Sequence, residues 1–377
     1  MRSIGICTLY TGFNYGSALQ AAATRQVLSN LGYRGEILKV SGSLIPGRDV
    51  RLKKMLVLGM NLMRHLPQMK KTVRSYLGDS RQSLSPETKE RFTHFYANFL
   101  KPLELTEGQM KKLAKGEEYA AFLCGSDQIW NSTTYYVDPF YYLTFAPTHK
   151  RIAFAPSFGR DYIAPHNRKK LKKYISAIPH LSIREDVGRD MIRELTGRDA
   201  QVLADPSLLL DRQEWCGLLG LSEEHQSEPY VLAYFLDEPS EKARETMKFY
   251  REKGYKILSL PYDRPGDWFD ACISAGPREF LQYLLNAEII CTDSFHGTAF
   301  SLNFEKPFHT FERQYGAATK QSARLTSLLK LVDMEDRYDA LPRDDTHPDW
   351  NCCRAVLEAE RKKSMEYLLT SLASLEK

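Results

Sequence analysis

The sequence predicts an α/β protein made of two Rossmann-like domains that face a central cleft. The chain has 377 residues, which is more than one hydrophobic core usually supports, so we expect two domains. Short apolar segments alternate with longer helical segments, as they do in parallel sheets whose strands are joined by helices. Polar loops follow several of the apolar segments, and α/β sheets carry their functional groups at such strand ends.

The expected boundary between the domains is the segment 221–229, because it is polar and ends in a proline. It separates an N-terminal Rossmann-like domain, 1–220, from a C-terminal one, 230–377. The last expected helix, 349–375, is long enough to pack back across both domains and the cleft.

The N-terminal domain opens with an apolar strand, 3–10, a polar loop, and a helix, 17–31, that ends at Gly32. This order of strand, loop and helix is how Rossmann-like domains begin. Charged helical segments are expected from there to Lys115. The elements that follow are the strands 119–124, 151–155, 180–183 and 201–204 and the helices 166–177 and 186–195.

The C-terminal domain repeats the alternation. The segment 288–291 is apolar enough for a buried parallel strand, and a small-residue helix starts shortly after it, at Gly297. The other expected elements are the strands 230–236, 256–260 and 306–311 and the helices 240–253, 278–287, 323–332 and 349–375.

The composition is that of an ordinary globular protein, with 43% hydrophobic and 26% charged residues. No run approaches the roughly 18 apolar residues of a membrane span, and the first residues lack the features of a signal peptide, so we expect a cytoplasmic protein. A net charge of +5 is too small to indicate a nucleic-acid partner without a motif of that class. The seven cysteines form no CxxC pair and no cluster has metal-ligand spacing, so neither disulfides nor a metal is expected.

Positive charge is concentrated in two segments, 48–74 and 168–173. In the first, basic residues are interleaved with apolar ones, so a helix over 55–76 could lie on the inner face of an anionic membrane. A solvated helix packed by its apolar face is the alternative, and we favour it.

One histidine, His296, stands between the expected strand 288–291 and the helix start at Gly297. The free N–H groups of a helix start favour an anion. Histidine is the side chain whose ordinary pKa lies nearest neutrality, so a histidine beside an anion site indicates acid–base chemistry. A satisfied structural histidine is the alternative.

Six short motifs occur in order along the chain: 14–20 (NYGSALQ), 125–131 (GSDQIWN), 157–159 (SFG), 182–185 (SIRE), 205–206 (DP) and 293–300 (DSFHGTAF). In this order and spacing they resemble the polysaccharide pyruvyl transferase family over essentially the whole chain. The resemblance implies a GT-B-like pair of Rossmann domains. By the resemblance, the family's acid–base histidine falls on His296, its motif aspartate on Asp127 and its motif arginine on Arg184.

The activity implied by the resemblance is transfer of pyruvate from phosphoenolpyruvate onto two hydroxyls of a sugar. The product would be a cyclic ketal on an exopolysaccharide, capsule or cell-wall glycan precursor, with release of phosphate. The expected partners are phosphoenolpyruvate and a sugar acceptor that could be lipid-linked, and no cofactor is expected besides the donor.

The donor presents a carboxylate and a phosphate, so its site needs several cations or N–H donors. Some branches of the family carry an arginine two residues before the histidine, where this chain has Ser294. Arg184 is the candidate cation in the first domain, and Arg324 or Lys320 could replace the missing arginine in the second. The remaining donor-binding candidates are Ser294 and Gly297 beside His296, and Asn14, Gly16 and Ser17 at the first helix start.

The acceptor is assigned to the N-terminal domain. Asp127 could accept a proton from a sugar hydroxyl or orient His296. Trp130 offers a flat apolar face for a sugar ring, Gln128 and Asn131 offer hydroxyl partners, and Tyr15 is placed in the same acceptor-binding set.

Structural roles are the alternatives for these residues. Asp127 could cap a loop, Trp130 could belong to the core, and Arg184 could pair with Glu185 or Asp186. The dipeptide 205–206 is expected to fix a turn, with no catalytic role.

Two other functions stay open for the chain as a whole. The same fold would serve a GT-B glycosyltransferase that uses a nucleotide sugar, and such an enzyme would bind a nucleoside diphosphate. A non-catalytic carbohydrate-binding or assembly protein is the third candidate, and it would keep its glycan association when His296 is replaced.

Overall fold

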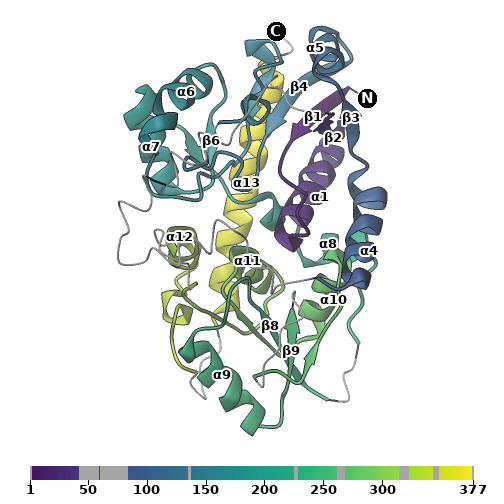
Figure 1. The fold of residues 1–377 in the computed structure, drawn as a ribbon, viewed down its shortest axis with the longest axis vertical. Helices are drawn as coiled ribbons and strands as arrows, with labels where there is room; N and C mark the ends of the chain where they lie inside the picture. Colours follow the sequence, from purple (N-terminus) through teal and green to yellow (C-terminus); the bar gives the residue numbers. More distant parts are fainter. Residues whose placement is uncertain are drawn as a thin grey trace. The chain divides into compact units, whose positions relative to one another are not determined.

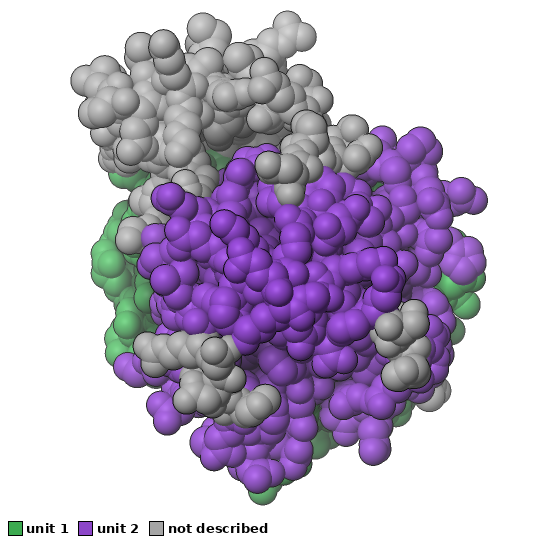
Figure 2. Space-filling model, turned by 90° about the horizontal axis from the view of Figure 1, so that it is seen from below, with its two compact units in different colours: residues 1–54, 96–209, 358–377 green, residues 55–95, 210–357 purple. Residues whose placement is uncertain are grey.

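A computed structural model describes residues 2–41, 59, 84–134, 137–224, 228–260, 268–313, 322–342 and 348–375. The chain divides into two compact units, which Figure 2 colours separately. Unit 1 comprises residues 1–54, 96–209 and 358–377, and unit 2 comprises residues 55–95 and 210–357. The segment 55–76, considered above as a membrane-binding helix, lies outside the described residues except for Gly59.

Each unit is assembled from separate stretches of chain, whereas the expected domains, 1–220 and 230–377, are continuous. Helix α8 (Arg212–Leu219) comes before the polar segment 221–229 and already belongs to unit 2. Within that unit, the Asn303 side-chain amide donates to the Leu210 carbonyl at 2.8 Å, and this hydrogen bond holds the start of the stretch 210–357 against helix α11 (Phe295–Asn303). Helix α13 (Trp350–Ala373) begins in unit 2 and continues into unit 1 from residue 358.

Unit 1 is built on a parallel sheet whose described strands run in the order β3-β2-β1-β4-β5 (Figure 1). The strands are β1 (Ser3–Cys7), β2 (Arg34–Val40), β3 (Leu103–Leu105), β4 (Tyr119–Cys124) and β5 (Arg151–Ala153). The order reverses beside β1, because the chain first adds strands on one side of it and then on the other. Ligands of doubly wound sheets bind at the carboxyl ends of the strands at this switch point.

Strands β2 and β3 correct the expectation of helical segments as far as Lys115. Charged residues hide β2 in the sequence, yet its Ile37 and Leu38 are buried in the sheet. The charges stand outside, where Lys39 of β2 pairs with Glu104 of β3 at 2.7 Å. Pairing with neighbouring strands therefore decides the conformation of this segment, and local charge pattern does not.

The other elements of unit 1 surround this sheet. They are helices α1 (Tyr15–Asn30), α5 (Glu107–Lys115), α6 (Pro165–Ser176) and α7 (Asp186–Thr196), a small parallel sheet of β6 (Ser182–Ile183) and β7 (Gln201–Val202), and short turns of helix η2 (Tyr96–Leu100), η3 (Pro139–Tyr142), η4 (Thr148–Lys150) and η5 (Pro206–Leu208). Helix α1 begins two residues earlier than expected, because Asn14 caps it by accepting from the Ser17 N–H at 3.0 Å.

Unit 2 repeats the same sheet order. Its described strands β8 (Tyr230–Tyr234), β9 (Lys256–Leu260), β10 (Ala271–Cys272), β11 (Ile289–Thr292) and β12 (Phe308–Thr310) are parallel and run β10-β9-β8-β11-β12. In order of appearance this is again third, second, first, fourth, fifth. The switch point of unit 2 therefore lies between β8 and β11.

The helices of unit 2 are α4 (Pro86–Phe95), α8, α9 (Glu241–Glu252), α10 (Pro277–Asn286), α11 (Phe295–Asn303), α12 (Ser322–Leu331), the first part of α13 and the short η6 (Glu335–Arg337). Every residue of α11 is buried. This is possible because the helix is short and is made of small and apolar residues.

The two parallel sheets confirm the expected α/β class and the expectation of two Rossmann-like units. None of the helices in the described ranges combines the length and the apolar character needed to cross a membrane. All seven cysteines are free thiols.

Candidate active site

Polar side chains gather at the carboxyl edge of each sheet, after the strand that occupies the same place in both units. In unit 1 the loop after β4 carries Asp127. In unit 2 the loop after β11 carries Asp293, and the first turn of the helix that follows it, α11, carries His296. Each of these strands pairs with the first strand of its own sheet, β1 or β8. Both clusters therefore lie at the switch point where α/β sheets bind ligands.

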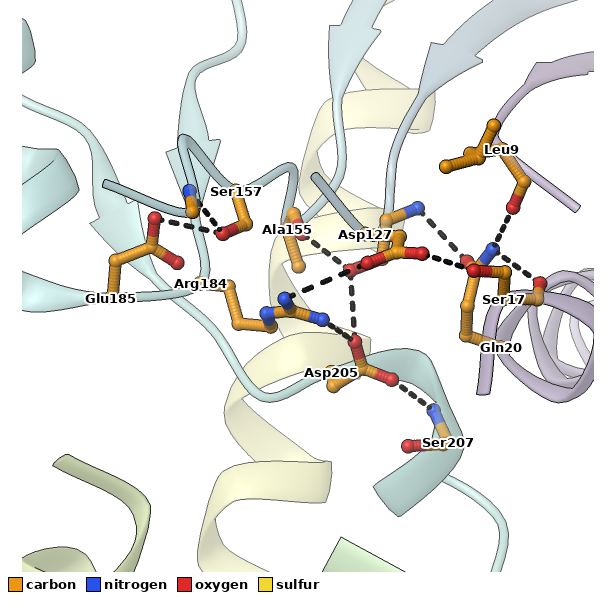
Figure 3. A network of polar contacts seen from close by, with 12 residues as sticks. Leu9, Ser17, Gln20, Asp127, Ala155, Ser157, Arg184, Glu185, Asp205 and Ser207 are labelled. Carbon is orange, nitrogen blue, oxygen red and sulfur yellow. Dashed lines mark hydrogen bonds and ion pairs between the residues drawn. The ribbon is translucent and has the colours of Figure 1, made fainter. Parts of the chain in front are cut away.

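Asp127 lies inside a buried polar network, which Figure 3 shows from close by. One of its carboxylate oxygens accepts a hydrogen bond from the Ser17 hydroxyl, on the first turn of α1. Its other oxygen lies 3.9 Å from Nη2 of Arg184, which directly follows β6. The Arg184 guanidinium also pairs through Nη1 with Asp205, the residue that caps η5. Only 8% of the Asp127 side chain is exposed, and that small part is where another molecule could reach it.

The loop that carries Asp127 is held in an uncommon backbone conformation. Asp127 has a φ of +65°, and non-glycine residues rarely adopt this left-handed region. At Gly125, with a φ of +130°, an added Cβ would overlap the Phe154 carbonyl, so only glycine fits. The Ser126 N–H donates to the Gln20 side chain at 3.1 Å and holds the middle of the loop. Such conformations persist where surrounding contacts enforce them, and they concentrate at functional sites.

The electrostatics of the network are those of one cation among carboxylates. Burial by itself disfavours the charged form of Arg184, but the Asp205 carboxylate, with Asp127 and Glu185, raises the pKa of the guanidinium above its ordinary value. Arg184 therefore stays charged inside unit 1. The Arg184 side chain is 3% exposed and already pairs with the Asp205 carboxylate, so the expected contact with a donor anion would compete with this ion pair.

Asp205 is the functional candidate that the sequence did not reveal in unit 1. It does fix the expected turn, because one oxygen accepts from the Ser207 N–H at 2.9 Å. Its other oxygen pairs with Arg184 and lies 3.1 Å from the Ser126 hydroxyl. The sequence could not show this second role, since the partners are 21 and 79 residues away.

Two of the expected acceptor contacts are corrected by burial. Trp130 is fully buried, stacks on Tyr142 with 5.4 Å between the ring centroids, and donates its indole N–H to the Tyr141 carbonyl at 3.0 Å. It therefore belongs to the core and presents no face to a sugar. Tyr15 is also fully buried, in the first turn of α1.

The other polar candidates of unit 1 have mixed positions. The Asn131 side chain accepts from the Thr133 N–H at 3.0 Å and so fixes a local turn. Gln128 is half-buried, and its side chain fills the space that a Cβ on Gly159 would need. At the start of α1, the Asn14 side chain takes the Ser17 N–H that was expected to meet an anion, and Gly16 beside it is buried.

His296 lies on the first turn of α11 in unit 2 and is 6% exposed. The helix starts there because Ser294 caps it, with its hydroxyl 3.5 Å from the Gly297 N–H. Gly297 lets the helix approach β11, since an added Cβ would come within 2.9 Å of the Thr292 Cβ. The Phe295 ring meets the imidazole edge to face, with 5.3 Å between centroids. All these contacts are made by residues 292–297, so residues close to His296 in the sequence place it at the end of β11.

Asp293 ties together the two strands at the switch point of unit 2. It accepts from the backbone N–H groups of Leu236 at 2.8 Å and Asp237 at 3.1 Å, both just after β8. Burial raises the pKa of this carboxyl, although Arg313 acts in the opposite direction. The Arg313 Nε lies 3.7 Å from the Asp293 carboxylate, and 23% of the Arg313 side chain is exposed.

Arg313 is a cation that sequence reasoning missed. It follows β12, the strand next to β11, and so reaches the same sheet edge as His296. The signal for it is a charged residue just after a short apolar strand. Arg324, an expected candidate on α12, has its guanidinium carbon 5.9 Å from the centre of the Phe295 ring. Lys320, the other expected candidate, lies outside the described residues.

The structure thus groups the candidates into two sets. Unit 2 places His296, Ser294 and Gly297 at one helix start, with Arg324 over the Phe295 ring and Arg313 beside Asp293. Unit 1 brings together Asp127, Ser17 and Arg184 and adds Asp205. The first set combines an imidazole with a helix start, where free N–H groups favour an anion. In the second, the Asp127 carboxylate is held by Ser17 and Arg184. No cluster of three or more histidine, cysteine, aspartate or glutamate side chains within the described segments could hold a metal ion.

The model of one protein family, described as polysaccharide pyruvyl transferase, matches residues 14–315 of the chain. No curated protein matches it.

Solved structures that are similar to the chain have low sequence identity. One is a UDP-GlcNAc 2-epimerase from Methanocaldococcus jannaschii, with a TM-score of 0.49, 12% identity, and coverage of 95% of this chain and 92% of that one. A putative UDP-N-acetylglucosamine 2-epimerase from Listeria monocytogenes has a TM-score of 0.45, 10% identity, and 96% coverage of both chains. An ADP-heptose heptosyltransferase II from E. coli has a TM-score of 0.37, 10% identity, and 100% coverage of both chains. Nothing about the activity of this chain follows from likenesses this weak.

Proposed function

Because the chain belongs to the polysaccharide pyruvyl transferase family, we propose that it transfers pyruvate from phosphoenolpyruvate onto two hydroxyls of a sugar in a polysaccharide precursor, with release of phosphate. The observation that carries the proposal is the position of His296. It lies on the first turn of α11 at the switch point of unit 2, with Arg313 on the adjacent strand end. An imidazole beside a helix start and a guanidinium suits a reaction that combines an anionic donor with proton transfer.

The proposed donor site is the start of α11. Phosphoenolpyruvate carries a carboxylate and a phosphate, and both groups favour a helix N-terminus and arginine side chains. Arg313 and Arg324 are the proposed cations, and Arg313 takes the part of the arginine that some family branches have at the position of Ser294. Its partial exposure leaves it able to meet a ligand, unlike the buried Arg184 of unit 1.

The reaction attaches two hydroxyl oxygens to one carbon. The first oxygen bonds to C2 of phosphoenolpyruvate as its proton is removed, and the methylene carbon gains a proton and becomes a methyl group. The second oxygen then bonds to C2 while the bond from C2 to the phosphate oxygen breaks, so phosphate leaves and the second hydroxyl loses its proton. His296 is the proposed acid and base, and such a group typically accelerates a reaction about 10²- to 10⁴-fold.

Asp127 is the proposed acceptor-side residue. Its carboxylate is fixed by Ser17 and Arg184, and a small part of it is exposed. A carboxylate in that state can accept a hydrogen bond from a sugar hydroxyl and orient it for attack. For this role the Asp127 carboxylate must be held in one orientation, and its contacts with Ser17 and Arg184 hold it there.

Phosphate release from phosphoenolpyruvate tests the proposal. The wild type is assayed with a panel of galactosides, glucosides and N-acetylhexosamine glycosides, beside His296→Ala and the control His94→Ala, which removes an exposed histidine from α4 of the same unit. We expect acceptor-dependent release from the wild type and the control and a loss of at least about 10²-fold in His296→Ala. Thermal stabilisation by a nucleoside diphosphate, with none by phosphoenolpyruvate and no phosphate release, would replace the proposal with a nucleotide-sugar glycosyltransferase.

A further inference from the structure

The buried network of unit 1 holds more charged groups than the proposed reaction uses. Arg184 meets the carboxylates of Asp127 and Asp205 directly, and Glu185 adds a third negative charge nearby. Glu185 is engaged elsewhere, since it accepts from the Ser157 hydroxyl at 3.0 Å and the Phe158 N–H at 2.9 Å. The pair of Arg184 and Asp205 therefore needs an explanation of its own, because buried ion pairs add little net stability to a fold.

We propose that Arg184 and Asp205 are positioning residues that act through Asp127, and that together they fix its carboxylate for the acceptor hydroxyl. This inference rests on the proposed function, which gives Asp127 its acceptor role. Figure 3 shows the arrangement, with dashed lines that join the Arg184 guanidinium to both aspartates.

The contacts of Asp205 support this role, because they reach Asp127 by two routes. Through Arg184, Asp205 places a positive charge 3.9 Å from one Asp127 oxygen. The Asp205 carboxylate also lies 3.1 Å from the hydroxyl of Ser126, the residue that precedes Asp127, and this hydroxyl lies 2.6 Å from the Ala155 carbonyl. The left-handed backbone of Asp127 needs such support, since it would otherwise relax to a commoner conformation.

Direct donor binding by Arg184 is the competing explanation, and burial argues against it. With 3% of the Arg184 side chain exposed and Asp205 fully buried, a donor anion would have to displace a buried carboxylate from its partner. That displacement would leave an unpaired charge in the interior, which is strongly unfavourable. A positioning role requires no such rearrangement.

The decisive variant removes both charges. Replacing only one of the pair leaves the other buried without its partner, and the fold could fail for that reason alone. The double variant Arg184→Gln/Asp205→Asn keeps similar shapes and avoids the unpaired charge. Its matched control is Arg193→Gln/Asp199→Asn, which removes an exposed ion pair of 2.9 Å from the same unit.

We expect the double variant to melt near the wild-type temperature and to lose kcat by about 10- to 100-fold, as misplacement of a reacting group does. The KM for phosphoenolpyruvate should stay within about twofold of the wild type, and the control should match the wild type in both constants. A raised KM for phosphoenolpyruvate with kcat intact would make Arg184 a donor ligand and overturn the proposal. Wild-type kcat in a folded double variant would show that the pair is only structural.

A second readout needs no turnover and separates this inference from the proposed function. Carboxyl groups are labelled with a water-soluble carbodiimide and a small amine, and Asp127 is followed by peptide mass spectrometry. If Arg184 and Asp205 fix Asp127, its labelling rate should rise several-fold in the double variant and stay unchanged in the control. An unchanged rate would overturn the positioning role. A wild type that releases no phosphate, with Asp127 labelling raised in the double variant, would contradict the proposed function and leave the positioning of Asp127 supported.

Discussion

His296 and Asp127 show what residue-scale reasoning can reach. Each follows an apolar strand and a short run of small or polar residues, so the local sequence is enough to predict that it lies at the edge of the sheet. Trp130 and Arg184 show the limit, because burial and distant partners decide their roles. The stacking of Trp130 on Tyr142 and the pairing of Arg184 with Asp205 depend on the packing of the whole unit. Arg313 was missed because its significance comes from β12 lying next to β11.

Arg313 carries the first residue-scale prediction. If it binds the donor, Arg313→Gln should raise the KM for phosphoenolpyruvate by roughly 10- to 100-fold, since a hydrogen bond to a charged group contributes about 1.5–3 kcal/mol. The acceptor KM should change little. Steady-state phosphate release measures both constants, with Arg244→Gln, an exposed arginine of the same unit paired with Glu238, as the control. An unchanged donor KM in an active Arg313→Gln enzyme would remove Arg313 from the donor site.

His309 carries the second, and it concerns pH. Burial, with Arg337 nearby, lowers the pKa of His309 to about 4, while the unfolded chain takes up this proton near the ordinary value of 6.5. The stability that depends on the neutral ring is therefore complete above pH 6.5 and is lost as the pH falls toward 4, by roughly 3 kcal/mol. The Tyr250 hydroxyl lies 2.8 Å from the ring Nε2 and stabilises this neutral form.

Denaturant unfolding between pH 4 and 7 measures this effect. His309→Gln should flatten the dependence on pH of the unfolding free energy of unit 2, whereas the exposed His94→Gln should leave it as in the wild type. Parallel curves for His309→Gln and the wild type would show that other groups set the acid sensitivity.

At the scale of elements, the junction of β11 and α11 was the most predictable part of the chain. An apolar strand, a capping serine and a helix of small and apolar residues follow one another directly along the sequence. Strands β2 and β3 were not predictable, because a charged or very short segment becomes a strand only when its neighbours offer hydrogen bonds. Helices and strands were therefore predicted best where residue type, capping residues and hydrophobic pattern all indicated the same structure.

The close approach of α11 to β11 gives an element-scale prediction. Gly297→Ala should lower the unfolding free energy by about 1–3 kcal/mol, because the new methyl group meets the Thr292 side chain within a buried junction. Gly217→Ala is the matched control on α8, where an added Cβ meets nothing within 4 Å. It should be neutral or stabilising by up to about 1 kcal/mol. Chemical denaturation of both variants measures the difference. Equal unfolding free energies for Gly297→Ala and Gly217→Ala would mean that α11 and β11 shift enough to accommodate the methyl group.

At the scale of the whole molecule, the chain passes between its units more than once. A sequence read from one end to the other suggests one linker, but 358–377 returns to unit 1 and 55–95 belongs to unit 2. No local pattern marks these exchanges, since they depend on which unit buries each apolar residue. The repeated sheet order of the two units is likewise visible only once the strands are paired.

The returning stretch makes a whole-molecule prediction. In the unit 1 part of α13, Leu368 is fully buried, Leu369 is 50% exposed, and Tyr367 donates to the Ala153 carbonyl at 2.8 Å. Leu368→Ala should therefore destabilise the protein by about 2–5 kcal/mol, and Leu369→Ala by much less. Hydrogen exchange should locate the loss in unit 1, for example in β4 and β5. Loss of protection confined to unit 2 would contradict the assignment of this stretch.

The central claim is that His296 serves a pyruvyl transfer in which the donor's methylene carbon gains a proton. The most direct measurement is mass spectrometry of the sugar product formed from phosphoenolpyruvate in D₂O, by the wild type and by His296→Gln. We predict a cyclic ketal whose methyl group carries deuterium from the solvent, formed with phosphate by the wild type and lost in the variant. A product that keeps the carbon–carbon double bond, or full activity in a folded His296→Gln protein, would contradict the claim.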